Sequence, residues 1–408
     1  MHRLSLRSRF TSTLLRRKFS NFTVSDTAIT LPALNGGASF PHIWLRDSCQ
    51  SDTCIHPTTR QKVHRTSDIP LDIKPVPNGV SISENDNDLV IDWTDGHRSS
   101  FSKEFLERHA DPVKLNAFHG HIYPKSWAPE ELTDDLYQTY ETLQRPDGLF
   151  RAIKQLSERG LLFITGVPNV ETSDEKCELN TLANKFGELR ETIYGRVWDV
   201  RNVRNSTNVA YTNLDLGFHI DLLHFANPPR YQVLHCVRNK VTGGSSIFVD
   251  ALRAAEILNQ ESPSDFDILA STPVPFQYIN NGHHTHYEHP TIELDTHPST
   301  NTEERVIKHI NYSPPFQAPL LLSTPPSFYS AFKRFTEVLN DPKNTFTYLL
   351  KEGDAVLFDN RRVLHARTAF QDIEEDDTLP VGQTNRWLKG CYFEGDAMWD
   401  KARMLRKA

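Results

Sequence analysis

Cysteine is scarce in this 408-residue chain, which contains five, and three of them stand alone in the sequence. So few thiols at such spacing argue against a disulfide framework and for a reducing compartment. No apolar run approaches the ~18–20 residues that a membrane span needs, and there is no internal repeat or low-complexity tract. With 38% hydrophobic and 24% charged residues, the composition is that of an ordinary soluble globular protein.

Acidic residues are absent from the first 25 positions. Residues 1–19 instead carry six basic residues and are rich in Ser and Thr, a composition typical of a mitochondrial transit peptide. The run Arg17-Lys18-Phe19-Ser20 resembles an arginine-guided processing site. We therefore predict a transit peptide over residues 1–25 and a mitochondrial location, with a disordered basic tail as the alternative.

The rest of the chain lacks positive charge. Without the six basic residues of the leader, 39 of the 45 basic residues remain against 52 acidic ones, a formal net charge of −13. A body this acidic binds polyanions poorly, which argues against nucleic acid as a partner. The charge is compatible with a small cationic substrate but does not by itself indicate one.

Local patterns divide the chain after the leader into two units. Residues 26–115 are polar and rich in turn signals, with strands expected at 80–82 and 89–93, and we interpret them as a small N-terminal β domain. The larger unit, 116–408, is entered through a polar link that ends at Pro129.

In the larger unit, apolar spacing predicts helices at 136–143, 149–160, 177–186, 328–339 and 397–405. Short apolar runs predict strands at 161–165, 218–223, 231–237, 246–250, 306–312, 346–350, 355–359, 363–368 and 386–393. Many short strands separated by turn signals indicate a double-sheet jelly roll, mainly β with flanking helices.

The triplet His219-Ile220-Asp221, with His365 placed 144 residues after Asp221, carries the strongest chemical signal. Alternate side chains of an extended segment share a face, so His219 and Asp221 can point at one centre that a folded sheet brings to His365. Two His and one carboxylate form the ligand set of the non-haem Fe(II) oxygenases. One such triplet arises by chance, and a lone His is more often a hydrogen-bonded core or surface residue. The full set predicts catalytic iron.

Two further residues could hold an anion beside that centre. The guanidinium of Arg386 can grip a dicarboxylate through a bidentate fork that Lys cannot reproduce. Ser246, which follows a Gly-Gly pair, offers a hydroxyl to the same anion. In isolation the pair is a turn and Arg386 a surface charge, but together with the triad they resemble the 2-oxoglutarate site of the Fe(II)/2-oxoglutarate oxygenases.

The chain resembles the γ-butyrobetaine dioxygenase and trimethyllysine dioxygenase family, part of the TauD/TfdA-like Fe(II)/2-oxoglutarate oxygenases, from about Ile43 to the C-terminus. The matching segments, in the same order throughout, are IWLRDSC at 43–49, YGRVW at 194–198, NVAYT at 208–212, HID at 219–221, LHC at 234–236, GG at 243–244, FDN at 358–360 and LHAR at 364–367. The resemblance implies a double-stranded β-helix catalytic domain and a zinc-associated N-terminal β domain. It also implies that the C-terminal helix could pair with a second copy in a homodimer.

The resemblance further implies how the cofactors bind. Iron would be chelated by 2-oxoglutarate, whose distal carboxylate meets Arg386 with Ser246 and Arg367 beside it. Reaction with O2 would release succinate and CO2 and hydroxylate a substrate C–H bond, with ascorbate as reductant.

A substrate site follows from the same resemblance. A trimethylammonium group cannot donate hydrogen bonds, so an aromatic box is the available way to bind it. The positions that match the family's substrate site are Tyr194, Trp198, Asn208, Tyr211 and Tyr392. Ser313 stands where γ-butyrobetaine hydroxylases have a second asparagine. Such aromatics could also be ordinary strand residues. We predict a γ-butyrobetaine-like substrate, as in carnitine biosynthesis, with trimethyllysine as the alternative that a mitochondrial address would favour.

The family's zinc site is a Cys-x-Cys-x2-Cys run plus a later His. Cys49 and Cys54 are present here, but Ser51 stands at the middle position and is a poor zinc ligand. His97 and His56 would complete a set of four if the loop allows it. A zinc site and a metal-free domain both remain open.

Residues 283–289 contain four histidines, and we predict a solvated loop over the active-site mouth here, not a metal site. A non-catalytic jelly-roll metabolite sensor is the second functional hypothesis, favoured by Ser51 and Ser313. A protein or histone demethylase would need an extended basic or peptide-binding surface that the sequence does not show.

Overall fold

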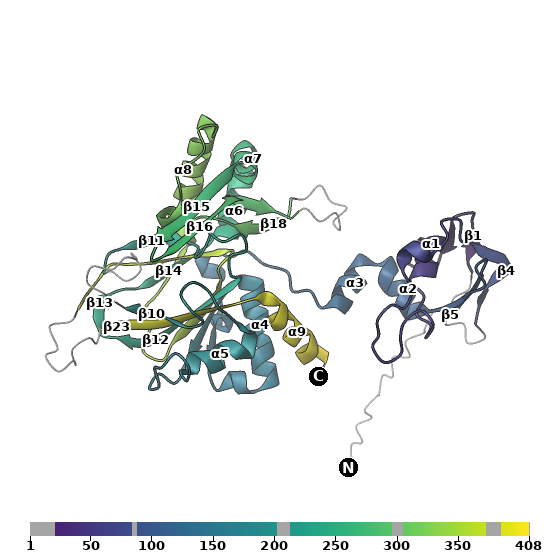
Figure 1. Cartoon of the computed structure of the whole chain (residues 1–408), viewed down its shortest axis with the longest axis horizontal. Helices are drawn as coiled ribbons and strands as arrows, with labels where there is room; N and C mark the ends of the chain where they lie inside the picture. Colours follow the sequence, from purple (N-terminus) through teal and green to yellow (C-terminus); the bar gives the residue numbers. More distant parts are fainter. Residues whose placement is uncertain (1–20, 84–87, 202–212, 296–304, 373–384, 408) are drawn as a thin grey trace, which may run out of the picture. The chain divides into compact units, whose positions relative to one another are not determined.

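The structure is a computed structural model, and it describes residues 21–83, 88–201, 213–295, 305–372 and 385–407 (Figure 1). The chain contacts divide it into two units, Met1–His121 and Ile122–Ala408. Most of the predicted leader lies outside the described residues. Its last part does not, because the first strand, β1 (Thr23–Val24), already belongs to a sheet, so the folded domain begins inside the segment predicted as leader.

The first unit contains two small antiparallel sheets and three short helices. Its elements are β1, β2 (Ala28–Leu31), β3 (Ala38–Pro41), α1 (His42–Asp47), β4 (Pro75–Ile82), β5 (Asp88–Trp93), β6 (Arg98–Ser102), α2 (Lys103–Ala110) and α3 (Pro112–His119). The sheets have the orders β1-β2-β3 and β4-β5-β6. Alternation along β5 buries Leu89, Ile91 and Trp93, as expected for a strand with one solvated face.

The larger unit contains two facing sheets with helices on their outer sides. Its helices are α4 (Pro146–Arg159), α5 (Glu178–Phe186), α6 (Ala251–Glu261), α7 (Pro263–Ser271), α8 (Pro326–Asn340) and α9 (Gly395–Lys407). Its strands are β7 (Tyr137–Thr139), β8 (Leu161–Thr165), β9 (Leu189–Arg190), β10 (Trp198–Arg201), β11 (Leu216–His219), β12 (Tyr231–Asn239), β13 (Val241–Gly243), β14 (Ser246–Asp250), β15 (Pro273–Asn280), β16 (His283–Pro290), β17 (Ile292–Leu294), β18 (Ile307–Ile310), β19 (Thr345–Tyr348), β20 (Ala355–Asp359), β21 (Val363–Arg367), β22 (Phe370–Asp372) and β23 (Arg386–Phe393).

The major sheet has the order β10-β23-β12-β20-β8-β7, with β9 also on β23, and the minor sheet has the order β11-β21-β14-β19. Helices α4, α5 and α9 share one apolar cluster with the major sheet, and α6, α7 and α8 share another with the minor sheet (Figure 1). A third cluster, which includes Phe163, Phe248 and Phe358, joins the two sheets. The predicted jelly roll with a small N-terminal β domain is confirmed.

Four local predictions were wrong. The helix expected at 136–143 is two single turns around β7, because the short strand pairs with β8 and tertiary pairing overrides the local spacing. The polar link contains α3, whose first turn is capped by the Asp111 carboxylate. The loop expected at 283–289 is strand β16, which pairs with β15 along its whole length. The strand expected at 218–223 ends at His219.

Among the described residues, no helix is both long and apolar enough to cross a membrane.

Candidate metal centre and cofactor pocket

Two imidazoles lie side by side on adjacent strands of the minor sheet. His219 ends β11 and is the direct register partner of His365 on β21, and the two rings lie 4.1 Å apart between centroids. The carboxylate of Asp221 completes the group, with Oδ1 3.4 Å from Nε2 of His219. One ligand atom from each of the three residues lies within 4.8 Å of the others. The structure therefore brings together the three residues of the predicted iron site.

Asp221 reaches this centre through a turn and not through an extended strand. The next residue, Leu222, has a φ of 62°, so the chain reverses directly after Asp221. The buried amide of Asn360 holds the turn: Oδ1 accepts from Asp221 N at 3.0 Å, and Nδ2 donates to the Asp221 and Pro229 carbonyls, both at 3.1 Å. A side chain from the β20–β21 turn thus fixes the backbone of the acidic residue.

The protonation states suit metal binding. Nδ1 of His219 lies 2.9 Å from the carbonyl of Gly217 and can donate to it, which leaves Nε2 as a lone-pair donor. Burial lowers the pKa of His365 to about 3, so this imidazole is neutral at pH 7. Burial opposes ionisation of Asp221, but the polar groups around its carboxylate, His219 and the Tyr392 hydroxyl that donates to Oδ2 at 2.8 Å, keep its pKa below the ordinary value. Neutral imidazoles and an ionised carboxylate are what a divalent ion requires, and this donor set fits iron.

A pocket opens on this group between the two sheets. It contains about 850 Å³ of space that no atom occupies, part of it continuous with solvent. Its walls are mostly apolar, and the polar and aromatic side chains among its lining are Tyr194, Trp198, His219, Asp221, Gln232, Ser246, Phe248, Phe316, His365, Arg367, Arg386 and Tyr392.

Two buried arginines and one serine line the end of the pocket near β14. Ser246 is the register partner of Arg367, and Arg386 comes from β23 of the facing sheet. The Gly-Gly pair makes room for Arg386, because a Cβ on Gly244 would lie 3.1 Å from its Nε. Burial lowers the pKa of each arginine to about 10, so both stay charged at pH 7. The arrangement suits a small anion with a carboxylate at this end.

Three predicted aromatic residues line another wall. The Trp198 ring lies 5.4 Å from that of Tyr392 and 6.2 Å from that of Tyr194, between centroids. Asn208 and Tyr211 lie outside the described residues. Ser313 is buried, is not among the residues that line the pocket, and its Oγ has no hydrogen-bond partner in the described part of the chain. Pro315 and Phe316, just after it, line the pocket instead.

The sequence also contained pocket residues that its patterns did not identify. Gln232 lies in the buried first half of β12, between Tyr231 and Val233, and its Oε1 has no partner among the described residues. An amide between apolar residues at the start of a buried strand is the signal that could have identified it. Phe316 had no such signal, because it reaches the pocket from a turn.

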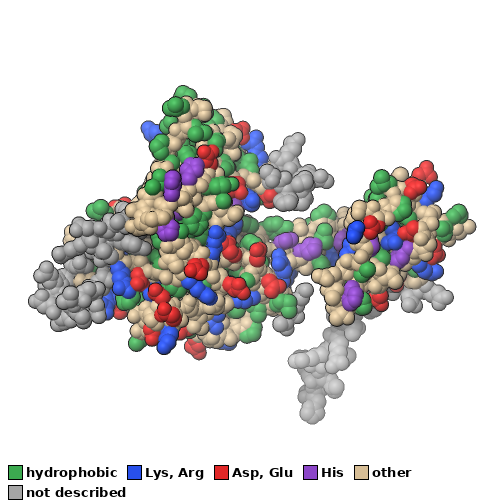
Figure 2. Space-filling view, in the orientation of Figure 1, with side chains coloured by type: hydrophobic (Ala, Val, Ile, Leu, Met, Phe, Trp, Pro, Cys, Tyr) green, Lys and Arg blue, Asp and Glu red, His purple; other side chains and the backbone are tan. Residues whose placement is uncertain are grey.

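The histidines of β16 lie apart from this chemistry. His283, His284 and His286 are exposed, and Figure 2 shows histidine side chains on the face over β15 and β16. Among the described residues these histidines belong to no group of three possible metal ligands. His289 is buried, with Nε2 3.0 Å from the Phe225 carbonyl.

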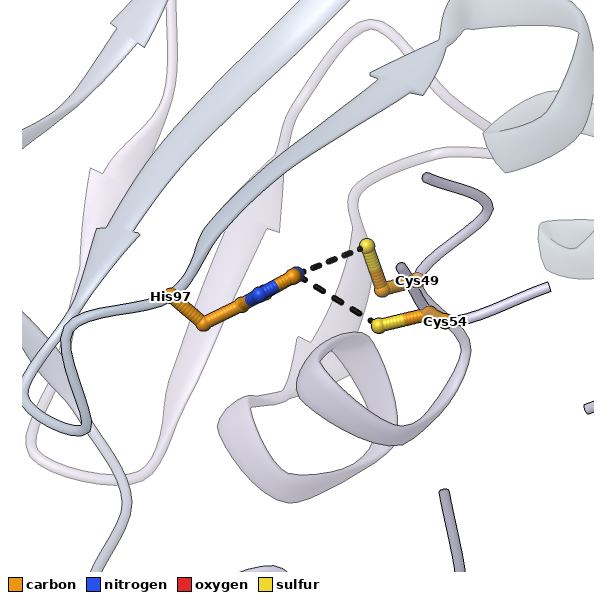
Figure 3. Close-up of side chains that lie close together, drawn as sticks. All are labelled: Cys49, Cys54 and His97. Carbon is orange, nitrogen blue, oxygen red and sulfur yellow. Dashed lines mark hydrogen bonds between the residues drawn. The ribbon is translucent and has the colours of Figure 1, made fainter. Parts of the chain in front are cut away.

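A second group of possible metal ligands lies in the first unit. Nε2 of His97 is 3.2 Å from Sγ of Cys49 and 3.5 Å from Sγ of Cys54 (Figure 3). Ser51 lies beside them, with Oγ 3.4 Å from the Cys49 thiol. The predicted fourth ligand, His56, is exposed and outside this group, and its Nδ1 accepts from the backbone amides that follow it. Three good zinc ligands are thus present, where a closed structural site has four.

Comparisons with known proteins place both units. Residues 124–392 match the family described as taurine catabolism dioxygenase TauD, TfdA family, and residues 29–107 match the gamma-butyrobetaine hydroxylase-like N-terminal family. The chain is 49% identical over 397 residues to "Dioxygenase str8" of Strobilurus tenacellus. The alignment covers 97% of this chain and 91% of that one.

Two named relatives are more distant. Gamma-butyrobetaine dioxygenase of Pseudomonas sp. (strain AK-1) is 33% identical over 374 residues, 90% of this chain and 91% of that one. Mitochondrial trimethyllysine dioxygenase of Gallus gallus is 29% identical over 369 residues, 90% of this chain and 83% of that one.

Proposed function

The chain belongs to the TauD/TfdA family of Fe(II)/2-oxoglutarate-dependent dioxygenases, and on this premise we propose that it hydroxylates a small trimethylammonium compound, most simply a γ-butyrobetaine-like one. The observation that carries the proposal is the aromatic wall of Tyr194, Trp198 and Tyr392 in the pocket that also contains the iron-type ligand group. The relatives named gamma-butyrobetaine dioxygenase and trimethyllysine dioxygenase support it.

Iron would be held by His219, Asp221 and His365. The hydrogen bond of His219 to Gly217 and those of Asp221 with Tyr392 and Asn360 would fix the orientation of the first two ligands. When bound, iron and 2-oxoglutarate supply the oxidising chemistry that hydroxylates an unactivated C–H bond and yields succinate and CO2.

The distal carboxylate of 2-oxoglutarate would be held by Arg386, with Ser246 and Arg367 beside it. The apolar rest of the pocket would exclude water from the reacting atoms. Ascorbate would serve to keep the iron reduced.

The positive trimethylammonium group would rest against the aromatic wall, where the ring faces attract a cation without hydrogen bonds. We assign no substrate contact to Ser313, since it lies outside the pocket lining. The substrate carbon that is hydroxylated would lie between this wall and the metal-ligand group.

The purified protein, loaded with Fe(II) under reducing conditions, should be supplied with 2-oxoglutarate, ascorbate and either γ-butyrobetaine or trimethyllysine. We expect γ-butyrobetaine to raise succinate release above the rate without amine, and mass spectrometry to show one added oxygen on the amine. If only trimethyllysine raises succinate release, trimethyllysine and not γ-butyrobetaine is the substrate. Binding of both cofactors with no product from any amine would favour a metabolite-binding protein without catalysis.

Trimethyllysine is the second candidate substrate. The observations that favour it are the basic segment at residues 1–19 and the relatives named mitochondrial trimethyllysine dioxygenase. We propose a mitochondrial location on the same grounds. A fusion of a fluorescent protein to the C-terminus should enter mitochondria, and removal of residues 1–19 should leave it outside them.

For the first unit we propose a zinc ion on Cys49, Cys54 and His97. The fourth position would fall to Ser51 or to water, because His56 is elsewhere. Elemental analysis of the purified protein should find zinc that is lost in the Cys49→Ser variant.

A further inference from the structure

Strand β23 turns every second residue toward the pocket, with one gap. Arg386, Leu388 and Tyr392 all line the pocket, as the alternation of a strand requires. Gly390 occupies the remaining place in this series and has no side chain to offer. Its register partner on the neighbouring strand β10 is Trp198.

The indole of Trp198 fills the place that a side chain at Gly390 would take. A Cβ built on Gly390 would lie 2.3 Å from Cη2, 2.4 Å from Cζ2 and 2.6 Å from Cζ3 of the indole. These distances are far inside van der Waals contact, and a fused aromatic ring cannot bend to relieve them. Gly390 is not among the glycines with positive φ, so the position requires space and not unusual backbone geometry.

The strand that carries Trp198 is fixed from the opposite face of the sheet. The carboxylate of Asp199, the next residue, accepts a hydrogen bond from Trp387 Nε1 at 2.7 Å and from the buried Lys389 Nζ at 2.8 Å. Lys389 directly precedes Gly390 along β23, and Trp387 lies three residues before it. If β10 moved away from β23, it would break the ion pair between Asp199 and the buried Lys389. A clash at Gly390 would therefore displace the ring and not the strand.

Packing alone holds the ring in place. Nε1 of Trp198 is buried and has no hydrogen-bond partner among the described residues, so no polar contact sets the orientation of the indole. Tyr392, two residues beyond Gly390, lies beside the indole at 5.4 Å with the planes inclined by 33°. The hydroxyl of Tyr392 in turn bonds to Asp221 of the metal group. The Trp198 indole, packed against Gly390, thus lies at a defined place relative to the metal-ligand group.

We propose that Gly390 is a specificity-determining residue: its missing side chain forms the slot in which the Trp198 indole lies, and so places the aromatic wall that selects a quaternary ammonium group. This inference rests on the proposed function, since it assigns the wall to that cation. Any side chain at this position would push the indole toward Tyr392 or into the pocket and remove the flat face from the substrate.

The first test compares Gly390→Ala with wild type in anaerobic calorimetric titrations, with Fe(II) and 2-oxoglutarate bound. The probes are γ-butyrobetaine and its neutral isostere, in which carbon replaces the quaternary nitrogen. We expect wild type to prefer the charged probe, and Gly390→Ala to bind it at least tenfold more weakly and to lose the preference. The affinity for 2-oxoglutarate, which binds at the arginine end, should stay within about twofold, whereas a merely unfolded variant would lose it. Wild-type selectivity in Gly390→Ala would overturn the proposal.

A thermal double-mutant cycle separates the slot from the substrate. Gly390→Ala should lower the melting temperature by about 3 °C in wild type, and by much less in a Trp198→Ala background, because the slot is then empty. The Trp198→Phe/Gly390→Ala double variant, with a smaller ring, should recover part of the loss. An equal fall in melting temperature in wild type and in the Trp198→Ala background would overturn the claim that Gly390 makes room for the indole. If wild type shows no preference for the charged probe, the proposed substrate class and the role of the wall fail together, while the cycle still decides whether Gly390 positions Trp198.

Discussion

At the scale of single residues, the candidate centre depends on side chains that never face the pocket. Asn360 makes three hydrogen bonds to backbone groups around Asp221, and an amide is the side chain that can both accept from an N–H and donate to carbonyls. Such outer partners of metal ligands hold the geometry that the ion then uses.

Replacing Asn360 with Ala should weaken Fe(II) binding by about 10- to 100-fold, because the turn that presents Asp221 loses its support. Anaerobic titration with Fe(II), at a temperature where circular dichroism shows the variant folded, measures this. Asn184→Ala, at an exposed helical position, is the matched control and should bind iron as wild type does. An unchanged iron affinity in Asn360→Ala would remove its positioning role.

Arg386 provides a second prediction at this scale. Arg386→Lys keeps the charge but loses the planar fork, at a cost of about 2 kcal/mol, so the KM for 2-oxoglutarate should rise roughly 30-fold with little change in iron binding. Arg334→Lys, at an exposed position on α8 that pairs with Asp265, serves as control. If both substitutions leave the KM alone, the anion lies elsewhere.

At the scale of elements, the sequence predicted strands well where burial and local pattern agree. β8, β14, β20 and β23 begin and end at the predicted residues, because each is a largely apolar segment bounded by turn signals. The prediction failed where a distant partner decides. The chain leaves the strand after His219 because Asn360 and the Tyr312 carbonyl, both far along the chain, bond to the turn.

The candidate site divides in the same way. The ligand types and the resemblance were enough to name His219, Asp221 and His365, which the structure brings together. The contact of Trp198 with Gly390 could not be predicted, because it depends on the register of two strands almost 200 residues apart. Likewise, the strand at His283–Pro290 depends on its pairing with β15 and could not be predicted from its local composition.

The α1 region with its Cys49, Cys54 and His97 group supports a prediction for an element. Ser51→Cys would place a third thiolate beside Cys49, where the hydroxyl now lies 3.4 Å away. We expect zinc to be retained at chelator concentrations that strip it from wild type, measured by a colorimetric zinc indicator. Thr58→Cys is the control, since it adds a thiol at an exposed position outside the ligand group. Equal retention in wild type and Ser51→Cys would mean that three protein ligands suffice.

At the scale of the whole molecule, buried histidines make the free energy of unfolding depend on pH. Burial lowers the pKa of both His224 and His235 to about 4, whereas in the unfolded chain each titrates near ~6.5. Between these values the unfolded chain binds protons that the folded one does not. Stability is therefore complete above about pH 6.5 and falls as the pH decreases toward 4.

Each such histidine should contribute a slope of about 1.4 kcal/mol per pH unit in that window. Urea unfolding of wild type and His235→Gln at pH 7.5 and at pH 5 measures it: the variant should lose less of its unfolding free energy between the two. His283→Gln, on the exposed β16 face, should behave as wild type. Identical pH dependence in His235→Gln would show that this ring is protonated in the folded state.

The pairing of His219 with His365 has one more consequence. These residues belong to neighbouring strands that are far apart in the sequence, and Asp221 is hydrogen-bonded to Asn360 of the β20–β21 turn. An ion bound by all three residues would link these strands, and because it binds only the folded state it would raise the free energy of unfolding of the loaded protein above that of the metal-free protein. The lifetime of the protein in the cell would then follow the supply of iron, quite apart from any effect of the metal on turnover.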